Sequence, residues 1–375
     1  MIYLDNAATT YPKPEEVYKY IDYLNRNYSF NAGRGSYKKA QEVSKMIEET
    51  RKLVSKVVNS STTIFSSSAT FAMNQIIYGL ELNEFSNVYY SPYEHNAVMR
   101  TLQKRCDEVG FNMIEMPIKP DSLSIDLEKL SYMYAKNNPS VVFCIHVSNV
   151  TGYILPIESI GLMSKNYQSI YIVDAAQSFS MIPIDMVKMK IDYVVFAGHK
   201  TLYSCFGIGG ICCNTQNKLK VYFVGGTGSN SLNLEMPSNS IQMYEPSSPN
   251  AVAIISISKS LEWINNNAKL IMQERELYSY FINRLKLLPN VIVYVDDSNE
   301  YFGVVSINVY GYKAEDIGMI LDEDYDICVR SGYHCAPIIH KYLKDESYYG
   351  TVRVGLSLFT TKADLDTLLK CLQGL

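Results

Sequence analysis

Lys200 and Asp174 each come close after an apolar run of the sequence, Tyr193–Phe196 and Tyr171–Val173 respectively. A lysine at the end of a buried strand is costly unless its amine is used. An amine and a carboxylate at neighbouring strand ends suit pyridoxal phosphate. The amine forms a Schiff base with the aldehyde, and the carboxylate keeps the pyridine nitrogen protonated. Taken singly, the two residues are better explained as a surface lysine and a helix-capping aspartate.

Further polar residues follow other apolar runs. In an open α/β sheet, ligands bind beyond the carboxyl ends of the strands. Ser66–Thr70 precedes an expected helix at Phe71–Leu80, where free amides and the Thr70 hydroxyl suit a phosphate, although a serine-rich cap without ligand is the simpler explanation. His95 could stack on a planar ring and relay protons, and Asn149 could bind a phenolic oxygen. Each of these residues is common by itself, but a series of such polar residues at successive strand ends, continued by Gln177 and His199, is unusual.

Alternating apolar and amphipathic stretches between residues 50 and 250 must position these groups, and this alternation predicts an α/β fold with a mainly parallel sheet. The expected strands are Thr62–Phe65, Asn87–Ser91, Val141–Val147, Ser169–Val173, Tyr193–Phe196 and Ile208–Cys213, with helices at Asp126–Asn137 and Ile157–Asn166.

The regular alternation of strands and helices ends near Asn250, and the pattern that follows predicts a smaller α+β domain. Its expected elements are helices at Val252–Asn265, Leu270–Leu288, Lys313–Leu321 and Lys362–Leu372 and strands at Val291–Val295 and Val304–Val309. We therefore expect a large domain over residues 15–250 and a small one formed by 1–14 with 251–375.

Composition narrows the function class. The 375 residues carry a net charge of −4 without a basic block, so we expect no nucleic-acid partner. The first residues lack the pattern of a signal peptide, and no apolar stretch is long enough for a bilayer, so a cytoplasmic protein without membrane association is expected. Eight scattered cysteines fit free thiols in a reducing compartment, and adjacent Cys212 and Cys213 are poor joint ligands, so no metal site is expected.

With these residues in order, the chain resembles class V aminotransferase-fold pyridoxal phosphate enzymes, most closely the cysteine desulfurase and selenocysteine lyase group of the short-loop type. The motifs that carry the resemblance run nearly end to end: Tyr3–Thr10, Gly33-Arg34-Gly35, Glu94-His95, Ser148–Gly152, Val173–Gln177, Gly198-His199-Lys200, Arg330–Ala336 and Arg353–Ser357. The resemblance implies fold type I, in which a large domain with a mainly parallel seven-stranded sheet precedes the small domain.

The resemblance also implies roles for individual residues. Lys200 would be the Schiff-base lysine, Asp174 would pair with the pyridinium, Gln177 and Asn149 would contact the phenolic oxygen and His95 would stack on the ring. The phosphate would be bound by Ala69, Thr70 and His199, and by Ser248 from the partner subunit of a homodimer with shared sites. Arg353, with Arg330 nearby, would hold the substrate carboxylate, for which a guanidinium fork is suited, and Asn6, Ala7 and Ala8 would line the substrate pocket.

Cys335 decides the expected reaction. In a desulfurase, a thiolate attacks the sulfur of L-cysteine, which leaves a protein persulfide and L-alanine. A thiolate near Arg330 and His334 is electrostatically favoured. A buried structural cysteine is the alternative. The compact sequence from Arg330 to Pro337 resembles desulfurases that pass sulfur to a dedicated acceptor protein, and His340 is expected to be exposed or to serve local packing.

Several positions depart from the family pattern. Ala197 stands where many relatives have a phosphate-binding serine, and Tyr37 stands where they often have histidine. Ser204–Gly207 replaces a Gly-Pro turn, and Glu245–Asn250, with prolines around Ser248, replaces a Glu-Ser-Gly-Thr-type run. These changes cluster around the expected phosphate site and subunit interface.

Three alternatives to a cysteine desulfurase stay open at this point. A selenocysteine lyase or another β-eliminating lyase would use the same scaffold with less need for Cys335. An aminotransferase or epimerase would make Cys335 incidental. A non-catalytic scaffold is the least favoured, and the altered phosphate and interface loops motivate it.

Overall fold

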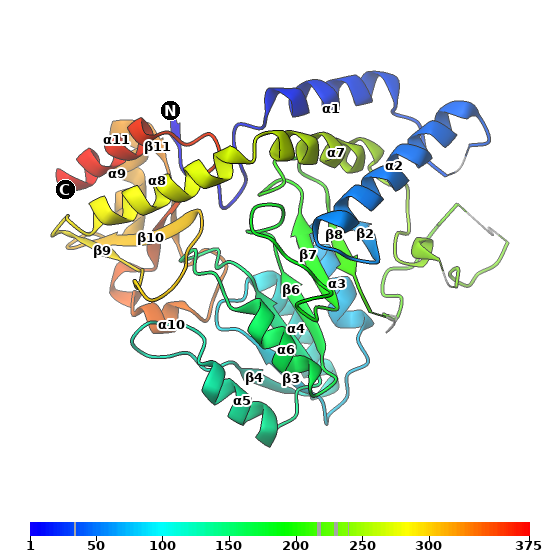
Figure 1. Ribbon diagram of the computed structural model, residues 1–375, viewed down its shortest axis with the longest axis horizontal. Helices are drawn as coiled ribbons and strands as arrows, with labels where there is room; N and C mark the ends of the chain where they lie inside the picture. The colour runs from blue at the N-terminus through cyan, green and yellow to red at the C-terminus, as the bar shows by residue number, and fades with distance from the viewer. Residues whose placement is uncertain (34, 216–218, 229–231, 239) are drawn as a thin grey trace.

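A seven-stranded sheet forms the centre of the protein. The computed structural model describes residues 1–33, 35–215, 219–228, 232–238 and 240–375. In spatial order the strands are β2 (Thr62–Ser66), β8 (Gly209–Cys213), β7 (Tyr193–Ala197), β6 (Ile170–Asp174), β5 (Val141–Ile145), β3 (Asn87–Tyr90) and β4 (Asn112–Glu115), as Figure 1 shows. From β7 to β4 all neighbours are parallel, and β8 is antiparallel to β7 and β2. The predicted mainly parallel α/β sheet is confirmed.

Helices cover both faces of this sheet, which explains why its inner strands β5 and β7 are buried and apolar along their whole length. Along β7, Val194 and Phe196 belong to one hydrophobic cluster, and Tyr193 and Val195 belong to another. The first cluster is completed by α2 (Lys38–Val57), α5 (Leu127–Lys136), α6 (Ile157–Lys165) and α7 (Ala251–Asn266). The second is completed by α3 (Ala69–Gly79) and α4 (Asn96–Val109). Strands buried on both sides keep their carboxyl ends at one fixed edge.

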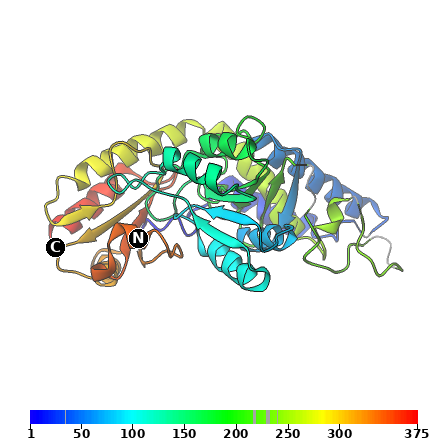
Figure 2. The ribbon, with the colours of Figure 1, turned by 90° about the horizontal axis from the view of Figure 1, so that it is seen from below.

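A second, antiparallel sheet follows near the C-terminus. Its order is β12 (Arg330–Gly332), β13 (Thr351–Gly355), β10 (Val304–Val309) and β9 (Val291–Val293). The remaining helices are α1 (Glu15–Asn27), α8 (Lys269–Leu285), α9 (Ala314–Tyr325), α10 (His340–Leu343) and α11 (Lys362–Gln373), with short 3₁₀ turns at Ile241–Met243 and Glu346–Tyr348. Figure 2 shows this sheet at one end of the molecule and α2 at the opposite end.

The N-terminal arm (residues 1–14) joins the C-terminal part of the chain. Its strand β1 (Ile2–Tyr3) pairs in parallel with β11 (Ile327–Cys328). Leu4 is fully buried in the same hydrophobic cluster as Phe281 and Val354. This packing agrees with the expected association of residues 1–14 with the C-terminal segment, and the domain limits at 14 and 250 stay a prediction.

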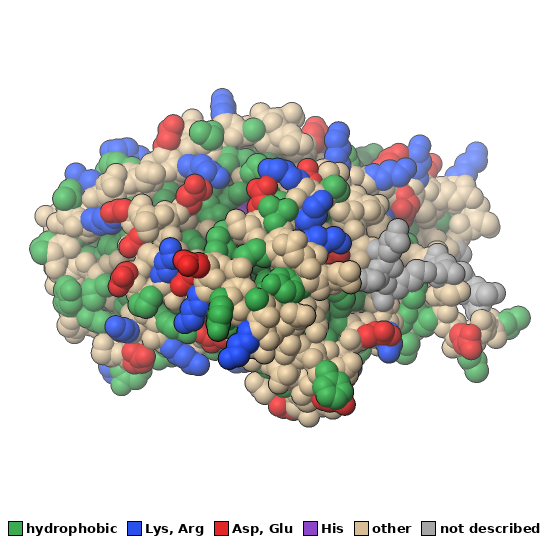
Figure 3. All heavy atoms as spheres, turned by 60° about the horizontal axis from the view of Figure 1, so that its bottom comes forward, with side chains coloured by type: hydrophobic (Ala, Val, Ile, Leu, Met, Phe, Trp, Pro, Cys, Tyr) green, Lys and Arg blue, Asp and Glu red, His purple; other side chains and the backbone are tan. Residues whose placement is uncertain are grey.

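The surface is of mixed charge. Figure 3 shows acidic and basic side chains interspersed over the face it presents, as the small net charge of −4 leads one to expect. Within the described ranges, none of the helices combines the length and the apolarity that a membrane crossing requires.

Gly152 marks a close contact between the loop after β5 and the C-terminal sheet. Its φ of +77° lies in the left-handed region, and a Cβ built there would lie 2.1 Å from the carbonyl oxygen of Val304. Its own carbonyl accepts a hydrogen bond from the amide of Phe302 at 2.9 Å. The backbone of β10 thus lies directly against this loop, and a side chain would push the two apart.

We expect Gly152→Ala to lower the free energy of unfolding by about 3 kcal/mol more than Gly110→Ala does. Gly110 is a matched control, because its φ is +84° but a Cβ there would meet nothing within 4 Å. Both variants are destabilised by a side chain at positive φ, and only Gly152→Ala also places its Cβ against the carbonyl oxygen of Val304. Urea denaturation of the two variants measures the difference, and equal destabilisation would contradict the contact.

Candidate active site

The carboxyl ends of the central strands open into a cavity of about 240 Å³. Its walls come from the residues that follow β3, β5, β6 and β7, from the start of α3, from the N-terminal arm and from β12 and β13. Parallel strands end at the same edge of the sheet, so side chains distant in sequence meet there. The expected site residues that line the cavity are Ala7, Ala8, Ala69, Thr70, His95, Asn149, Asp174, Gln177, His199, Lys200, Arg330 and Arg353.

Lys200 and Asp174 line this cavity, and the pKa of each is shifted from its ordinary value. Burial lowers the pKa of Lys200 to about 8, Asp174 acts in the opposite sense, and Arg353 and Arg330 lower it further. Burial raises the pKa of Asp174, while the amide of Ala176 and the charge of Lys200 lower it. That amide donates to Asp174 Oδ1 at 2.9 Å, which leaves Oδ2 for a ligand. The pair thus combines an amine that loses its proton near neutrality with a buried carboxyl.

His95 is held in one tautomer by the helix that it caps. Its Nδ1 accepts a hydrogen bond from the amide of Ala97 at 3.0 Å, at the start of α4. Because Nδ1 is an acceptor, the neutral ring carries its proton on Nε2. Burial, followed by the charge of Lys200, lowers the pKa of His95 to about 3. The ring in the cavity wall is therefore neutral and offers one donor.

Asn149 and Gln177 have amide groups that the fold uses only in part. Asn149 Nδ2 donates to the carbonyl of His334, and Gln177 Nε2 donates to the carbonyl of Ala7, both at 2.7 Å. Each amide nitrogen carries a second proton. Asn149 Oδ1 is buried and has no partner among the described residues. Unmet hydrogen-bonding capacity of this kind fits a polar ligand in the cavity.

The start of α3 forms a cradle at the other end of the cavity. Ser68 caps the helix through its side chain, and Thr70 is exposed in the first turn. A Cβ at Gly209 would lie 2.8 Å from the amide nitrogen of Ala69, so β8 approaches the helix end closely. His199 Nδ1 is buried without a partner in the described part of the chain, and burial lowers the pKa of this ring to about 4. Free amides at a helix start suit a phosphate.

Two arginines lie directly opposite each other on neighbouring strands of the C-terminal sheet. Arg330 of β12 pairs in register with Arg353 of β13. Arg353 is almost fully buried, donates to Asp5 Oδ1 at 2.7 Å and to the carbonyl of Asn149 at 3.0 Å, and has an unpartnered Nε within the described residues. Like charges in such a pair are unfavourable unless an anion joins them. One carboxylate, Asp5, offsets two guanidinium groups.

Cys335 lies beside this pair. Arg330 Nη2 donates to the Cys335 sulfur at 3.4 Å, and the thiol is partly exposed. The expectation that His334 also favours the thiolate is wrong. Burial and the charge of Arg353 hold the pKa of His334 well below its usual value, so the ring is neutral. Its Nε2 lies 2.9 Å from Thr351 Oγ1, where it serves the fold.

Three expected site residues are not among those that line the central cavity: Cys335, which lies beside it against Arg330, and Asn6 and Ser248, which lie farther away. Asn6 is buried and uses its amide on the carbonyls of Tyr3 and Gly355, and it lines a smaller neighbouring cavity. Ser248 is exposed and lines a separate cavity of about 370 Å³ beside α3. Asn6 is thus a structural residue of the arm in this chain, and the role of Ser248 toward a partner subunit stays a prediction.

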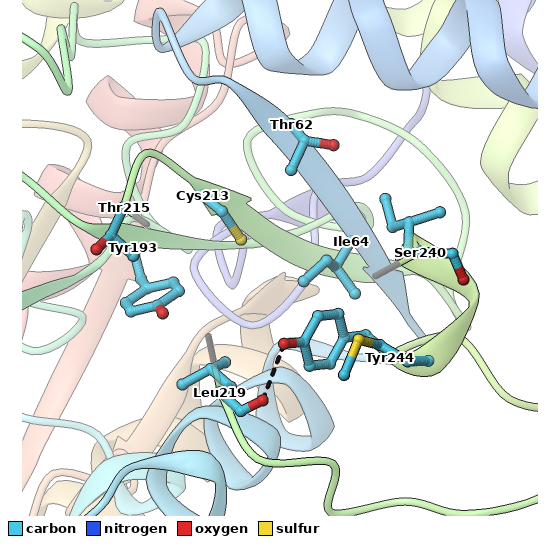
Figure 4. Close-up of a pocket in the computed structure, with 10 residues that line it drawn as sticks. Thr62, Ile64, Tyr193, Cys213, Thr215, Leu219, Ser240 and Tyr244 are labelled. Atoms are coloured by element: carbon cyan, nitrogen blue, oxygen red, sulfur yellow. Dashed lines mark hydrogen bonds between the residues drawn. The ribbon is translucent and has the colours of Figure 1, made fainter. Parts of the chain in front are cut away.

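A further cavity of about 310 Å³ lies at the β2–β8 edge of the sheet (Figure 4). Its walls are mostly apolar, with Ile64 and Cys213 from the strands, and Tyr244 closes one side by donating to the carbonyl of Leu219 at 2.8 Å. It contains none of the residues that the sequence predicts for chemistry. The central cavity is therefore the candidate site.

Comparison with known proteins agrees with this geometry. Residues 2–368 match the family model described as aminotransferase class-V. The chain belongs to the class-V aminotransferase family. Arg34, within its Gly33-Arg34-Gly35 motif, lies outside the described residues.

Individual class-V relatives are similar over the whole chain. A probable cysteine desulfurase of Pyrococcus abyssi is 29% identical over 390 residues, covering 100% of this chain and 94% of that protein. A cysteine desulfurase of Wigglesworthia glossinidia brevipalpis is 28% identical and covers 99% of this chain and 92% of its own length. The apo structure of a cysteine desulfurase from Thermococcus onnurineus NA1 superposes with a TM-score of 0.89 at 26% identity, covering 100% of this chain and 94% of that one.

The fold also brings in residues of this class-V chain that the sequence did not single out. The carbonyl of His199 accepts hydrogen bonds from Thr9 Oγ1 at 3.0 Å, from the Thr10 amide at 3.2 Å and from Lys13 Nζ at 2.6 Å. Thr10 Oγ1 also donates to the carbonyl of Lys200 at 3.0 Å. Burial lowers the pKa of Lys13 to about 7. In the sequence Lys13 stands between two prolines and close to Glu15 and Glu16, so no local signal marked these contacts.

Glu94 is a buried carboxyl below the cavity. Its Oε1 accepts hydrogen bonds from Ser91 Oγ and from the amide of Ile145, both at 2.6 Å. Burial raises its pKa to about 8, and the charge of Asp174 acts in the same sense. Glu94 is therefore protonated at neutral pH, and Asp174 is the carboxyl with an oxygen facing the cavity.

Replacing Glu94 by glutamine tests this protonation through the pH dependence of stability. The pKa of Glu94 is about 8 in the folded protein, against an ordinary value of 4.5 for a glutamate side chain. Between these values the folded state holds the proton more tightly, so Glu94 makes stability fall by about 1.4 kcal/mol for each pH unit as pH rises. Glutamine does not titrate. We expect the unfolding free energy of Glu94→Gln, relative to wild type, to rise steadily from about pH 5 to about pH 8. Denaturation curves of the wild type, this variant and exposed Glu16→Gln measure it, and parallel pH profiles would refute the buried proton.

Proposed function

We propose that this protein is a pyridoxal phosphate-dependent cysteine desulfurase that converts L-cysteine to L-alanine and takes up the sulfur as a persulfide on Cys335. The observation that carries the proposal is the contact of Arg330 with the Cys335 sulfur at 3.4 Å beside the cavity that contains Lys200. A nucleophilic sulfur, a reactive amine and a carboxylate-binding fork are thus present together. The relatives named as cysteine desulfurases support the same activity.

The residues of the cavity fit the cofactor. Asp174 would bind the pyridinium nitrogen, Asn149 and Gln177 would give their second amide protons to the phenolic oxygen, and His95 would lie against the ring. Asn149 Oδ1 and His199 Nδ1 are buried and have no hydrogen-bond partner in the part of the chain that the structure describes, so they are available to a ligand. The phosphate would lie at the start of α3 with Ala69, Thr70 and His199. When bound, pyridoxal phosphate supplies an electron sink that makes bonds at the substrate's α-carbon labile.

Lys200 would hold the cofactor and carry the proton. Its pKa of about 8 means that a useful fraction is neutral near physiological pH, as a nucleophilic amine requires. The same amine, in the cavity wall, is placed to return a proton to the substrate carbon at the end of the reaction.

The two arginines would bind and orient the substrate carboxylate. Arg353 is fixed by Asp5 and by the carbonyl of Asn149, and Arg330 adds a second positive charge from the opposite strand. An incoming carboxylate relieves the repulsion between them, and guanidinium groups bind it with strong, directional hydrogen bonds. Ala7 and Ala8 line the same wall and leave room for a small side chain.

Cys335 would take the sulfur. Its thiolate forms a bond to the substrate sulfur, and the substrate's carbon–sulfur bond breaks with its electron pair left on carbon. That carbon gains a proton and becomes the methyl group of alanine, so atoms and charge balance with Cys335 as the persulfide. Arg330 Nη2 donates to the Cys335 sulfur at 3.4 Å, which would hold the nucleophile beside the arginines that bind the substrate carboxylate.

Partners follow from the same assignment. We propose a homodimer in which Ser248 reaches the phosphate of the partner's cofactor, and a sulfur-acceptor protein that docks near the partly exposed Cys335. The exposed position of Ser248, on a loop beside α3, supports the first. All eight cysteines are free thiols, which supports a reducing cytoplasm as the location.

Cys335→Ala tests the persulfide step. With L-cysteine and a thiol reductant, we expect the wild type to form alanine and sulfide in equal amounts and the variant to lose at least about 100-fold in rate, since no other nucleophile replaces the sulfur. Amino-acid analysis and a sulfide assay measure both products. Full activity in the variant would sink the persulfide mechanism. Pyruvate in place of alanine, or activity on selenocysteine alone, would support an eliminating lyase or a selenocysteine lyase instead.

Lys200→Ala tests the cofactor assignment. We expect the purified wild type to be yellow from covalently bound pyridoxal phosphate, and the variant to lose that visible absorbance and its activity while keeping its fold. Absorption spectra before and after borohydride reduction, followed by peptide mass spectrometry, locate the attachment. Cofactor found on another lysine, or a colourless wild type that does not bind added pyridoxal phosphate, would contradict the proposal.

A further inference from the structure

The loop that carries Cys335 has a strained backbone. His334 and Cys335 have φ values of +47° and +58°, and Gly332 just before them has +102°. Two consecutive residues with a Cβ rarely adopt the left-handed region, and such strain persists only where the surroundings fix it. Something in the structure must therefore hold this loop.

Three successive carbonyl groups of the loop are held by donors from three different segments. The carbonyl of Cys335 accepts from the amide of Asn96 at 2.7 Å, and the carbonyl of His334 accepts from Asn149 Nδ2 at 2.7 Å. The carbonyl of Tyr333 accepts from the amide of Ala336 within the turn and faces His340 Nε2, both at 3.0 Å. Asn96 and Asn149 belong to the edge of the cavity, whereas His340 approaches from behind the loop.

His340 is buried, so of its two expected alternatives exposure is wrong, and its contacts are with the nearby residues Tyr333 and Asp345. Its side chain and that of Asp345 are 5% and 0% exposed, and His340 Nδ1 lies 2.5 Å from Asp345 Oδ2. A carbonyl oxygen only accepts, so Nε2 is the nitrogen that donates to Tyr333, and Nδ1 faces the Asp345 carboxyl. A buried ionisable pair adds little stability against an apolar replacement, so its use lies in fixing a conformation.

We propose that His340 and Asp345 form a positioning pair that holds the Cys335 loop in its strained conformation, with the sulfur against Arg330. This inference rests on the proposed role of Cys335 as the sulfur nucleophile. Asp345 orients the imidazole, the imidazole fixes the carbonyl of Tyr333, and the two following residues are turned so that the thiol faces the guanidinium. The pair acts through the backbone and does not line the cavity.

The test compares His340→Ala with His340→Gln and Asp345→Ala. We expect His340→Ala and Asp345→Ala to lower kcat for alanine formation by about tenfold or more, because a misplaced nucleophile slows only the sulfur transfer. KM and the change in cofactor absorbance on adding L-cysteine should stay close to those of the wild type, because the substrate-binding residues are untouched. Gln has an amide nitrogen able to replace Nε2, so His340→Gln should recover most of the rate. Lys341→Ala, an exposed neighbour on α10, is the matched control.

A second measurement does not need turnover. Alkylation of Cys335 by iodoacetamide, followed by mass spectrometry, should slow in His340→Ala and Asp345→Ala, since the sulfur loses its contact with Arg330, and should be unchanged in Lys341→Ala. Unchanged kcat and unchanged alkylation in both variants would overturn the proposal. Equal losses in kcat and in substrate binding, or no recovery with glutamine in a folded variant, would also overturn it. If Cys335→Ala keeps desulfuration, the proposed function fails, and alkylation alone then decides the positioning role.

Discussion

The His199–Lys200 peptide is the point on which the site depends, because it is held from two sides. Strand β7 fixes it from the sheet, and the N-terminal arm fixes it through Thr9, Thr10 and Lys13. The arm is in turn anchored by Leu4 in the C-terminal core and by the pairing of β1 with β11. A backbone carbonyl has only two lone pairs, so the convergence of several donors on His199 leaves it little freedom. The Lys200 side chain therefore starts from a fixed backbone.

The side chains around the cavity carry more positive than negative charge, so a bound anion would be stabilised there. Lys200, Arg330 and Arg353 are cationic groups around it, and Asp174 and Asp5 are the carboxylates that offset them. The other buried acid below the site, Glu94, is kept protonated by burial and by Asp174. A second carboxylate there would compete with Asp174 for the same positive partner. The surplus positive charge beside Cys335 is suited to an amino acid's carboxylate and to a thiolate.

The sequence predicted the central strands well and the connections between distant residues poorly. β7 and β6 are apolar on both faces, so their runs were recognisable without alternation, whereas α2 is a long charged surface helix with an apolar stripe that was not recognised. Lys200, Asp174 and Asn149 could be predicted because each follows a strand of one parallel sheet. The partnership of Asp5 with Arg353 spans 348 residues and has no local signal.

Ala197 and Phe206 shape the surroundings of His199 in the cavity wall. Ala197 lines the cavity and offers no hydroxyl. Phe206, in the segment that replaces the usual Gly-Pro turn, stacks on His199 with ring centroids 4.5 Å apart and an interplanar angle of 21°. The stacked ring restricts the imidazole, and His199 Nδ1, which has no partner among the described residues, stays available to a ligand. At both Lys200 and Cys335, a residue of the site is held through its backbone. The N-terminal arm binds the carbonyls of His199 and Lys200, and His340 contacts the carbonyl of Tyr333 in the Cys335 loop.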